Sequence, residues 1–126
     1  MHAKNEIVLV EDDEGMRQAI ARMLRGSGYQ VLAFDSAEAL LDQLNGEAFW
    51  ASCRCLVCDV RLPGASGFEL YRRLADLGPT PPWIFITAHD DPAVRIQAER
   101  DGAAYLLKPF AGRALLALIG QAVHPR

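Results

Sequence analysis

The chain has 126 residues, 51% of them hydrophobic, and a formal net charge of -3. This length and apolar content suit one domain with a buried core, so we expect a single domain over residues 1–126. The negative net charge disfavours a protein that binds nucleic acid through a basic surface. The polar N-terminus and the lack of a run of roughly 18 apolar residues predict neither a signal peptide nor a membrane span, and the cytoplasm is the expected location.

Short aliphatic runs alternate with amphipathic segments along the chain. The aliphatic runs are typical of strands, and the segments between them carry apolar residues at helical spacing. Glycine, proline or asparagine stands at most of the junctions. The predicted strands lie at 7–10, 29–34, 55–59, 83–87 and within 104–109, and the predicted helices at 14–26, 37–44, 68–78, 92–101 and 111–123.

The predicted strands are almost continuously aliphatic, which is typical of a parallel sheet covered by helices on both faces. The fold class is therefore α/β, with a doubly wound sheet. In such a sheet the carboxyl ends of the strands meet at one edge, where these folds bind their ligands. Asp12 and Asp13 follow the first strand, and Asp59 ends the third. Thr87 ends the fourth strand and Lys108 follows the fifth, so we expect all five side chains to meet.

The residue types at this edge indicate phosphoryl-transfer chemistry. Carboxylates that converge without a cation raise one another's pKa. A hard divalent cation, Mg²⁺ or Mn²⁺, takes oxygen ligands and relieves the repulsion. Lys108 adds a mobile positive charge and Thr87 a hydroxyl donor. A carboxylate, a metal, a lysine and a hydroxyl group together are typical of a site that transfers phosphoryl groups.

Four motifs carry a resemblance to a known family. They are VEDD at the first strand end, CDVRLPGASGFEL around Asp59, IFITA through Thr87 and YLLKPF through Lys108. In this order and at these strand ends they resemble a receiver domain of two-component response regulators, in the CheY-like superfamily. The loop after Asp59 is most similar to receivers of FixJ-type transcription regulators. The resemblance implies a flavodoxin-like sheet with strand order 2-1-3-4-5 and five helices.

The resemblance also implies a role for each site residue. Asp59 would accept a phosphoryl group from a histidine of a sensor kinase or of a histidine phosphotransfer protein. Asp12 and Asp13 would hold Mg²⁺ together with Asp59 and the backbone carbonyl of Arg61. Lys108 would pair first with Asp59 and then with a phosphoryl oxygen.

The family's switch lies on the neighbouring surface. Thr87 would move to bind the phosphoryl group, Tyr105 would swing inward, and the Lys108–Pro109 peptide bond would be cis. The fourth helix, fifth strand and fifth helix would then change and control an output, most simply transcription, through a homodimer or an output domain. The domain itself would bind neither nucleic acid nor a membrane.

Three other functions have to be weighed against this one. A degenerate receiver would bind partners without phosphorylation, but the five site positions are all present. A phosphatase with an aspartate nucleophile usually needs a second acid two residues later, where this chain has Arg61. A flavin-binding module would need a phosphate-cradling loop after the first strand, where EDDEG is acidic instead. Glu11 stands where the family often has an apolar residue, and Arg61 and His89 occupy positions that tune dephosphorylation in the family. Arg61 could pair with Glu11 or screen the site, and the sequence does not decide between these roles.

Cysteines and glycines supply further expectations. Cys53, Cys55 and Cys58 crowd one short stretch, where zinc ligation is an alternative, but the stretch is a predicted strand and favours buried free thiols. Gly64 and Gly67 are expected to make the loop after Asp59 flexible.

The last helix has a wide apolar arc. One stripe is formed by residues 115, 118 and 122, and a second by residues 116, 119 and 123. The arc fits either a broad core-facing helix or a helix that also covers a partner.

Overall fold

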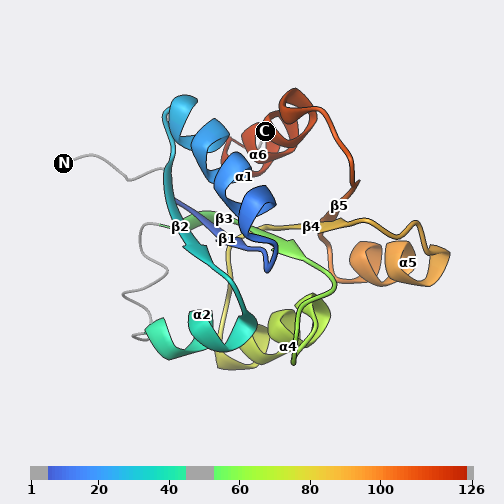
Figure 1. The fold of residues 1–126 in the computed structure, drawn as a ribbon. Coiled ribbons are helices and arrows are strands. Elements are labelled where there is room, and N and C mark those ends of the chain that lie inside the picture. The colour runs from blue at the N-terminus through green and yellow to red at the C-terminus, as the bar shows by residue number, and fades with distance from the viewer. Residues whose placement is uncertain (1–5, 45–52, 125–126) are drawn as a thin grey trace.

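A parallel sheet forms the centre of the computed structural model, which describes residues 6–44 and 53–124. Figure 1 shows the sheet with its helices, and the strand order is β2-β1-β3-β4-β5. The predicted α/β class and the strand order 2-1-3-4-5 are confirmed. The strands of the described ranges are β1 (Glu6–Val10), β2 (Gln30–Phe34), β3 (Cys53–Asp59), β4 (Trp83–Thr87) and β5 (Ala104–Leu107).

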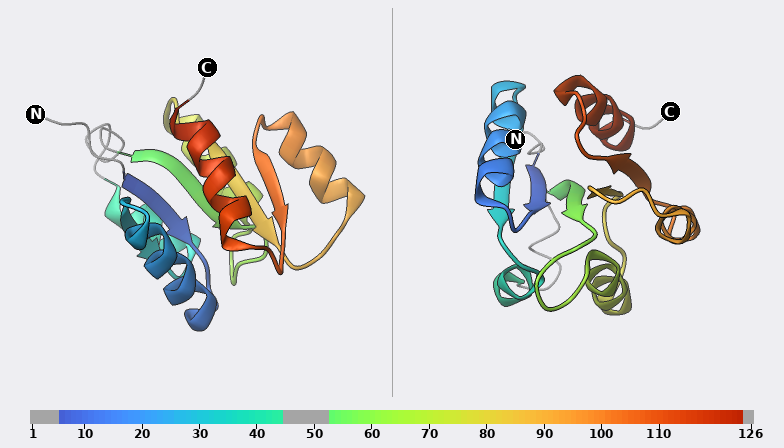
Figure 2. Two further views of the ribbon diagram at one scale, coloured as in Figure 1. Left: turned by 90° about the horizontal axis from the view of Figure 1, so that it is seen from above. Right: turned by 45° about the vertical axis from the view of Figure 1, so that its right-hand side comes forward.

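Helices cover both faces of the sheet. Figure 2 shows α1 and α6 on one face, with α2 and α4 on the other. The five helices found in the described ranges are α1 (Glu14–Gly26), α2 (Ala37–Gln43), α4 (Gly67–Leu77), α5 (Pro92–Arg100) and α6 (Gly112–Val123). Their bounds lie close to the predicted ranges, although Asn45 and Gly46, predicted to stop the second helix, lie outside the described residues. None of the helices in 6–44 and 53–124 is long and apolar enough to cross a membrane.

The strand side chains alternate between two hydrophobic clusters. Val8 and Val10 of β1 face the cluster under α2, α4 and α5, whereas Ile7 and Leu9 face the cluster under α1 and α6. All four are fully buried. The aliphatic runs therefore reflect a sheet that is covered on both sides.

The three cysteines are buried and free, as predicted. A register shift at the start of the β1–β3 pairing leaves Cys53 and Cys58 on the α2–α4 face and Cys55 on the α1–α6 face. The three thiols therefore lie on two sides of the sheet, and the zinc alternative is not supported. Burial raises the pKa of Cys53 and Cys55 to about 12 and that of Cys58 well above its ordinary value, so the thiols stay protonated.

Helix α6 uses its wide apolar arc mainly on the core. Leu115 and Ile119, one from each predicted stripe, are fully buried. The other four residues of the arc pack half-buried against the same cluster: Leu116, Leu118, Ala122 and Val123. The broad core-facing helix is therefore the better interpretation.

Candidate functional site

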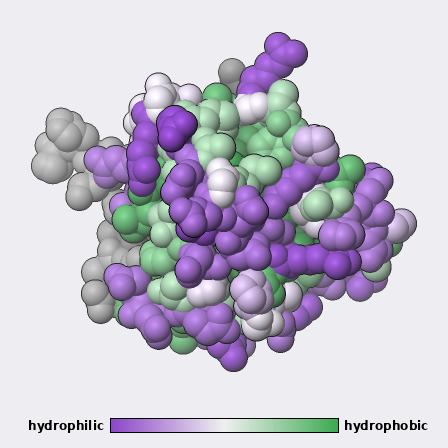
Figure 3. Space-filling view, in the orientation of Figure 1, coloured by the Kyte–Doolittle hydropathy of each residue, from purple (hydrophilic) through white to green (hydrophobic). Residues whose placement is uncertain are grey.

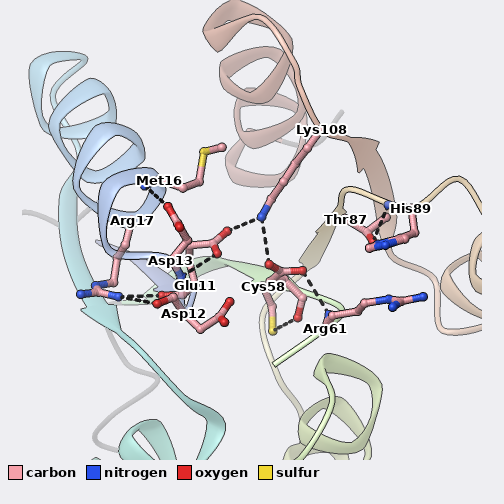
Figure 4. A network of polar contacts seen from close by, with 11 residues as sticks. Glu11, Asp12, Asp13, Met16, Arg17, Cys58, Arg61, Thr87, His89 and Lys108 are labelled. Carbon is pink, nitrogen blue, oxygen red and sulfur yellow. Dashed lines mark hydrogen bonds and ion pairs between the residues drawn. The ribbon is translucent and has the colours of Figure 1, made fainter. Parts of the chain in front are cut away.

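Strands β1 and β3 end near the middle of the view in Figure 1, and hydrophilic residues gather there on the surface in Figure 3. Figure 4 shows that Glu11, Asp12, Thr87 and Lys108 lie around this edge. Lys108 Nζ is 2.7 Å from Glu11 Oε1 and 2.9 Å from Asp59 Oδ2. Of the five side chains expected to meet, Lys108 and Asp59 are in direct contact, and Lys108 also joins Asp59 to Glu11.

Glu11 is a member of this site that the sequence did not assign. Its side chain is 0% exposed, and its second oxygen accepts a hydrogen bond from the Asp13 backbone N–H at 3.1 Å. Burial raises the pKa of Glu11, while the hydrogen bonds from Lys108 and Asp13 partly offset this effect.

Lys108 stays charged in the same surroundings. Burial by itself would lower the pKa of Lys108, but hydrogen bonds and charge attraction from Glu11 and Asp59 outweigh it, and the pKa is raised. One lysine cannot neutralise two carboxylates, so negative charge remains at the site for a cation to balance.

Three carboxylates form a group suited to such a cation. One oxygen each of Glu11, Asp12 and Asp59 lie within 4.8 Å of one another. Glu11 and Asp59 are buried and Asp12 is exposed, so the group opens to water on one side. A set of hard oxygen donors with an open side fits Mg²⁺, which usually keeps several of its waters.

Asp13 has a different place from the one predicted. Its side chain accepts a hydrogen bond from the Met16 backbone N–H at 2.8 Å and caps the N-terminus of α1. It is not in the carboxylate group, which takes Glu11 instead. The expectation that Asp13 holds the metal is therefore not supported by this geometry. The signal was an acid three residues before Met16, the spacing of an N-cap.

The loop after Asp59 is closely packed. Asp59 Oδ1 accepts a hydrogen bond from the Arg61 N–H at 3.1 Å, while Oδ2 faces Lys108. Gly67, the first residue of α4, donates its N–H to the Val60 carbonyl at 2.9 Å. A Cβ at position 67 would lie 2.5 Å from the Asp59 carbonyl oxygen. Gly67 was expected to make this loop flexible, but here glycine instead permits a close approach of two backbone segments.

Arg61 and His89 both lie at the rim of the site. The Arg61 side chain is exposed and extends away from Glu11 in Figure 4, so it does not pair with that carboxylate. The His89 N–H donates to Thr87 Oγ1 at 3.2 Å.

Thr87 and Tyr105 are connected through His89. Thr87 is 1% exposed, and the half-buried Tyr105 donates its hydroxyl to the His89 carbonyl at 3.2 Å. The Arg95 guanidinium carbon is 5.3 Å from the centre of the Tyr105 ring. The backbone of one residue thus contacts both side chains predicted to switch. The Lys108–Pro109 peptide bond is cis, as the resemblance implied.

Comparison with known proteins agrees with this geometry. The family model for the response regulator receiver domain matches residues 7–120. The transcriptional regulatory protein FixJ of Bradyrhizobium diazoefficiens is 36% identical over 125 residues, which cover 98% of this chain and 59% of FixJ. The response regulator protein TmoT of Ectopseudomonas mendocina is 37% identical over 118 residues, which cover 93% of this chain and 52% of TmoT.

Solved structures show the same similarity. The non-phosphorylated HemR receiver domain from Leptospira biflexa matches with a TM-score of 0.84 and 27% identity, over 98% of this chain and 97% of that one. The chain spans little more than half the length of FixJ and TmoT. The chain belongs to the family of response regulator receiver domains.

Proposed function

We propose that this domain accepts a phosphoryl group on Asp59 from a phosphohistidine of a sensor kinase or a histidine phosphotransfer protein. The observation that carries the proposal is the joint contact of Asp59 with Lys108, at 2.9 Å, and with the carboxylate group formed with Glu11 and Asp12. In the transfer, an Asp59 oxygen forms a bond to phosphorus while the P–N bond breaks and its electron pair leaves with the imidazole.

Mg²⁺, or Mn²⁺ in its place, would be held by the carboxylates of Glu11, Asp12 and Asp59 and by the Arg61 backbone carbonyl. When bound, the cation balances the negative charge that the phosphoryl group brings. Glu11 takes the role first expected of Asp13, because its carboxylate lies in the group and that of Asp13 caps α1.

The switch starts when the phosphoryl oxygens attract new donors. Lys108 exchanges its contact with Asp59 for one with a phosphoryl oxygen, and Thr87 donates its hydroxyl to another. Thr87 now accepts the His89 N–H, and Tyr105 binds the carbonyl of the same residue, so a shift of Thr87 carries Tyr105 inward. The surface formed by α5, β5 and α6 then changes.

The output is a protein contact and not a reaction on another molecule. We propose that residues 1–126 form one receiver domain in the cytoplasm and that its α5–β5–α6 surface contacts a second copy or an output domain that controls transcription. FixJ and TmoT, which are named as regulators, support this assignment. The domain itself binds neither nucleic acid nor a membrane.

Intact mass after incubation with acetyl phosphate and Mg²⁺ tests the acceptor. The wild type should gain about 80 Da, the mass of one phosphoryl group, and Asp59→Asn should gain nothing. Asp76→Asn, which removes an exposed carboxylate in α4, is the matched control and should gain as the wild type does. No gain in the wild type, with acetyl phosphate or with a phosphorylated histidine donor, would instead favour a receiver that works without phosphorylation.

A further inference from the structure

Arg17 in the first turns of α1 reaches back to the loop that carries the acidic group. Its Nη1 atom donates to the Glu11 carbonyl at 2.9 Å and lies 3.4 Å from the Asp12 carbonyl. Figure 4 shows the guanidinium group beside the loop, on the side away from Lys108. The side chain is half-buried. No motif in the sequence pointed to this residue.

Arg17 binds backbone carbonyls and not the neighbouring carboxylates. Residues 11–14 are all acidic and precede Arg17 by only three to six positions, yet the salt bridges of the described residues include none to Arg17. Its guanidinium group binds the two carbonyls whose residues provide carboxylates to the group. The contact therefore fixes the backbone without using any carboxylate oxygen of the acidic group.

The loop needs such a restraint because its carboxylates repel one another. Oxygens of Glu11, Asp12 and Asp59 come within 4.8 Å, and among the described residues the Lys108 ammonium group forms its salt bridges with Glu11 and Asp59. Asp12 is exposed and is not held by Lys108. Without Arg17, its carboxylate is free to turn toward water and away from Asp59.

We propose that Arg17 is a positioning residue for the cation site, one that spans the backbone carbonyls of Glu11 and Asp12 and keeps both carboxylates turned toward Asp59. This inference rests on the proposed metal site. It adds to that site a residue that does not touch the metal.

The positioning role of Arg17 and its positive charge predict opposite effects on metal affinity when Arg17 is replaced. Arg17 is a cation near a cation site, so the loss of its charge alone would strengthen metal binding. The loss of a positioning contact would weaken metal binding, typically by tenfold or more for groups that orient metal ligands. The sign of the change separates the two roles.

The test measures the Mn²⁺ dissociation constant from the electron paramagnetic resonance signal of the free ion, on folded protein without phosphodonor. Arg17→Gln removes the charge and the carbonyl contacts, and Arg17→Lys keeps the charge. Arg22→Gln is the matched control, since Arg22 is an exposed arginine on the same helix whose described contacts include no hydrogen bond. Urea unfolding without metal separates a loss of stability from a loss of affinity.

Arg17→Gln should bind Mn²⁺ about tenfold more weakly than the wild type, and Arg22→Gln within about twofold. Arg17→Lys should recover only part of the loss, because the lysine side chain is one bond shorter and does not bring its nitrogen to the position of Nη1, which makes both carbonyl contacts. If Arg17→Gln fails to fold, the affinity of Arg17→Lys alone tests the inference. Equal or tighter binding by Arg17→Gln, or wild-type affinity in Arg17→Lys, would overturn the inference and leave the metal site intact. A wild type that binds no Mn²⁺ would overturn both.

Discussion

The two sides of the carboxyl edge are built differently. The β1–α1 side is closely connected: Glu11 is fully buried and bonded to Lys108, and Asp13 and Arg17 tie the loop to its helix. On the β4–α5 side, residues 88–91 are all exposed. Helix α1 buries three residues against the core (Ile20, Ala21 and Leu24) and α5 buries only Ala98.

This difference suits two tasks. A site that holds a cation and a phosphoryl group works best with ligands fixed in advance. A segment that moves in response must be cheap to displace, with few buried contacts. We therefore expect changes on the β1–α1 side and in the Asp59 loop to cost much stability, and changes on the β4–α5 side to cost little while they alter local motion.

The largest effect should come from Lys108→Met, which breaks the buried contacts on the connected side. The substitution leaves Glu11 and Asp59 without their shared cation, and removal of one partner of a buried pair costs about 3 kcal/mol. Urea unfolding at pH 7 in the presence of a chelator measures this loss. Arg113→Gln, an exposed change of the same charge on α6, should stay within about 0.5 kcal/mol of the wild type. Similar losses in both variants would mean that the Lys108 contacts do not stabilise the site.

Gly67→Ala should rank second, since it forces atoms into the packed Asp59 loop. The new Cβ would lie 2.5 Å from the Asp59 carbonyl oxygen, and overpacking of this kind costs about 1–3 kcal/mol. The control is Gly26→Ala at the end of α1, where an added Cβ meets nothing within 4 Å. If Gly67→Ala unfolds at the same urea concentration as the control, the loop has room to adapt and is as loose as the other side.

Sequence patterns predicted one part of this site better than the other. Asp59, Thr87 and Lys108 were placed correctly at the sheet edge because each ends or follows a well-defined strand. The choice among the acids at 11–14 depended on a boundary of one residue between strand and helix. All four have the same chemistry, so the pattern could not separate the buried Glu11 from the cap Asp13.

Other features of the site depend on tertiary approach and have no local signal. The close approach of Gly67 to the Asp59 carbonyl, which an added Cβ would meet at 2.5 Å, forms only once the start of α4 lies against the end of β3. The bonds from Arg17 to the β1–α1 loop likewise appear only once the helix is in place. Neither residue type nor spacing distinguishes these two residues from any other glycine or arginine of the chain.

A smaller effect is expected in the pH dependence of stability. The pKa of Glu11 is raised above its ordinary 4.5 in the folded protein. Protonated Glu11 therefore adds to the free energy of unfolding below pH 4.5, and this addition is lost as pH rises through the folded pKa. Glu69, which completes the capping box of α4, has a lowered pKa. Its contribution is present above its ordinary pKa of 4.5 and is lost as pH falls through the folded pKa.

Urea unfolding from pH 4 to pH 8 in wild type, Glu11→Gln and Glu69→Gln tests these signs. The stability of the wild type minus that of Glu11→Gln should fall as pH rises, and the same difference for Glu69→Gln should rise. Two difference curves of the same slope would show that burial does not govern Glu11. The buried Glu11 carboxylate would then make no distinct pH-dependent contribution to the stability of the β1–α1 side.

Tyr105→Phe should have the smallest effect on global stability and the clearest effect on motion. The change removes the hydroxyl that binds the His89 carbonyl at 3.2 Å, and because this contact is at the surface its loss should cost about 0.5 kcal/mol or less. Backbone amides of residues 88–91 should exchange with solvent several times faster, because a contact between the loop and β5 is lost. Tyr29→Phe is the control, as the described contacts give the Tyr29 hydroxyl no hydrogen bond. Unchanged exchange in Tyr105→Phe would show that the exposed side of the edge is held by something other than this contact, and the contrast with the β1–α1 side would then be smaller than the hydrogen bonds indicate.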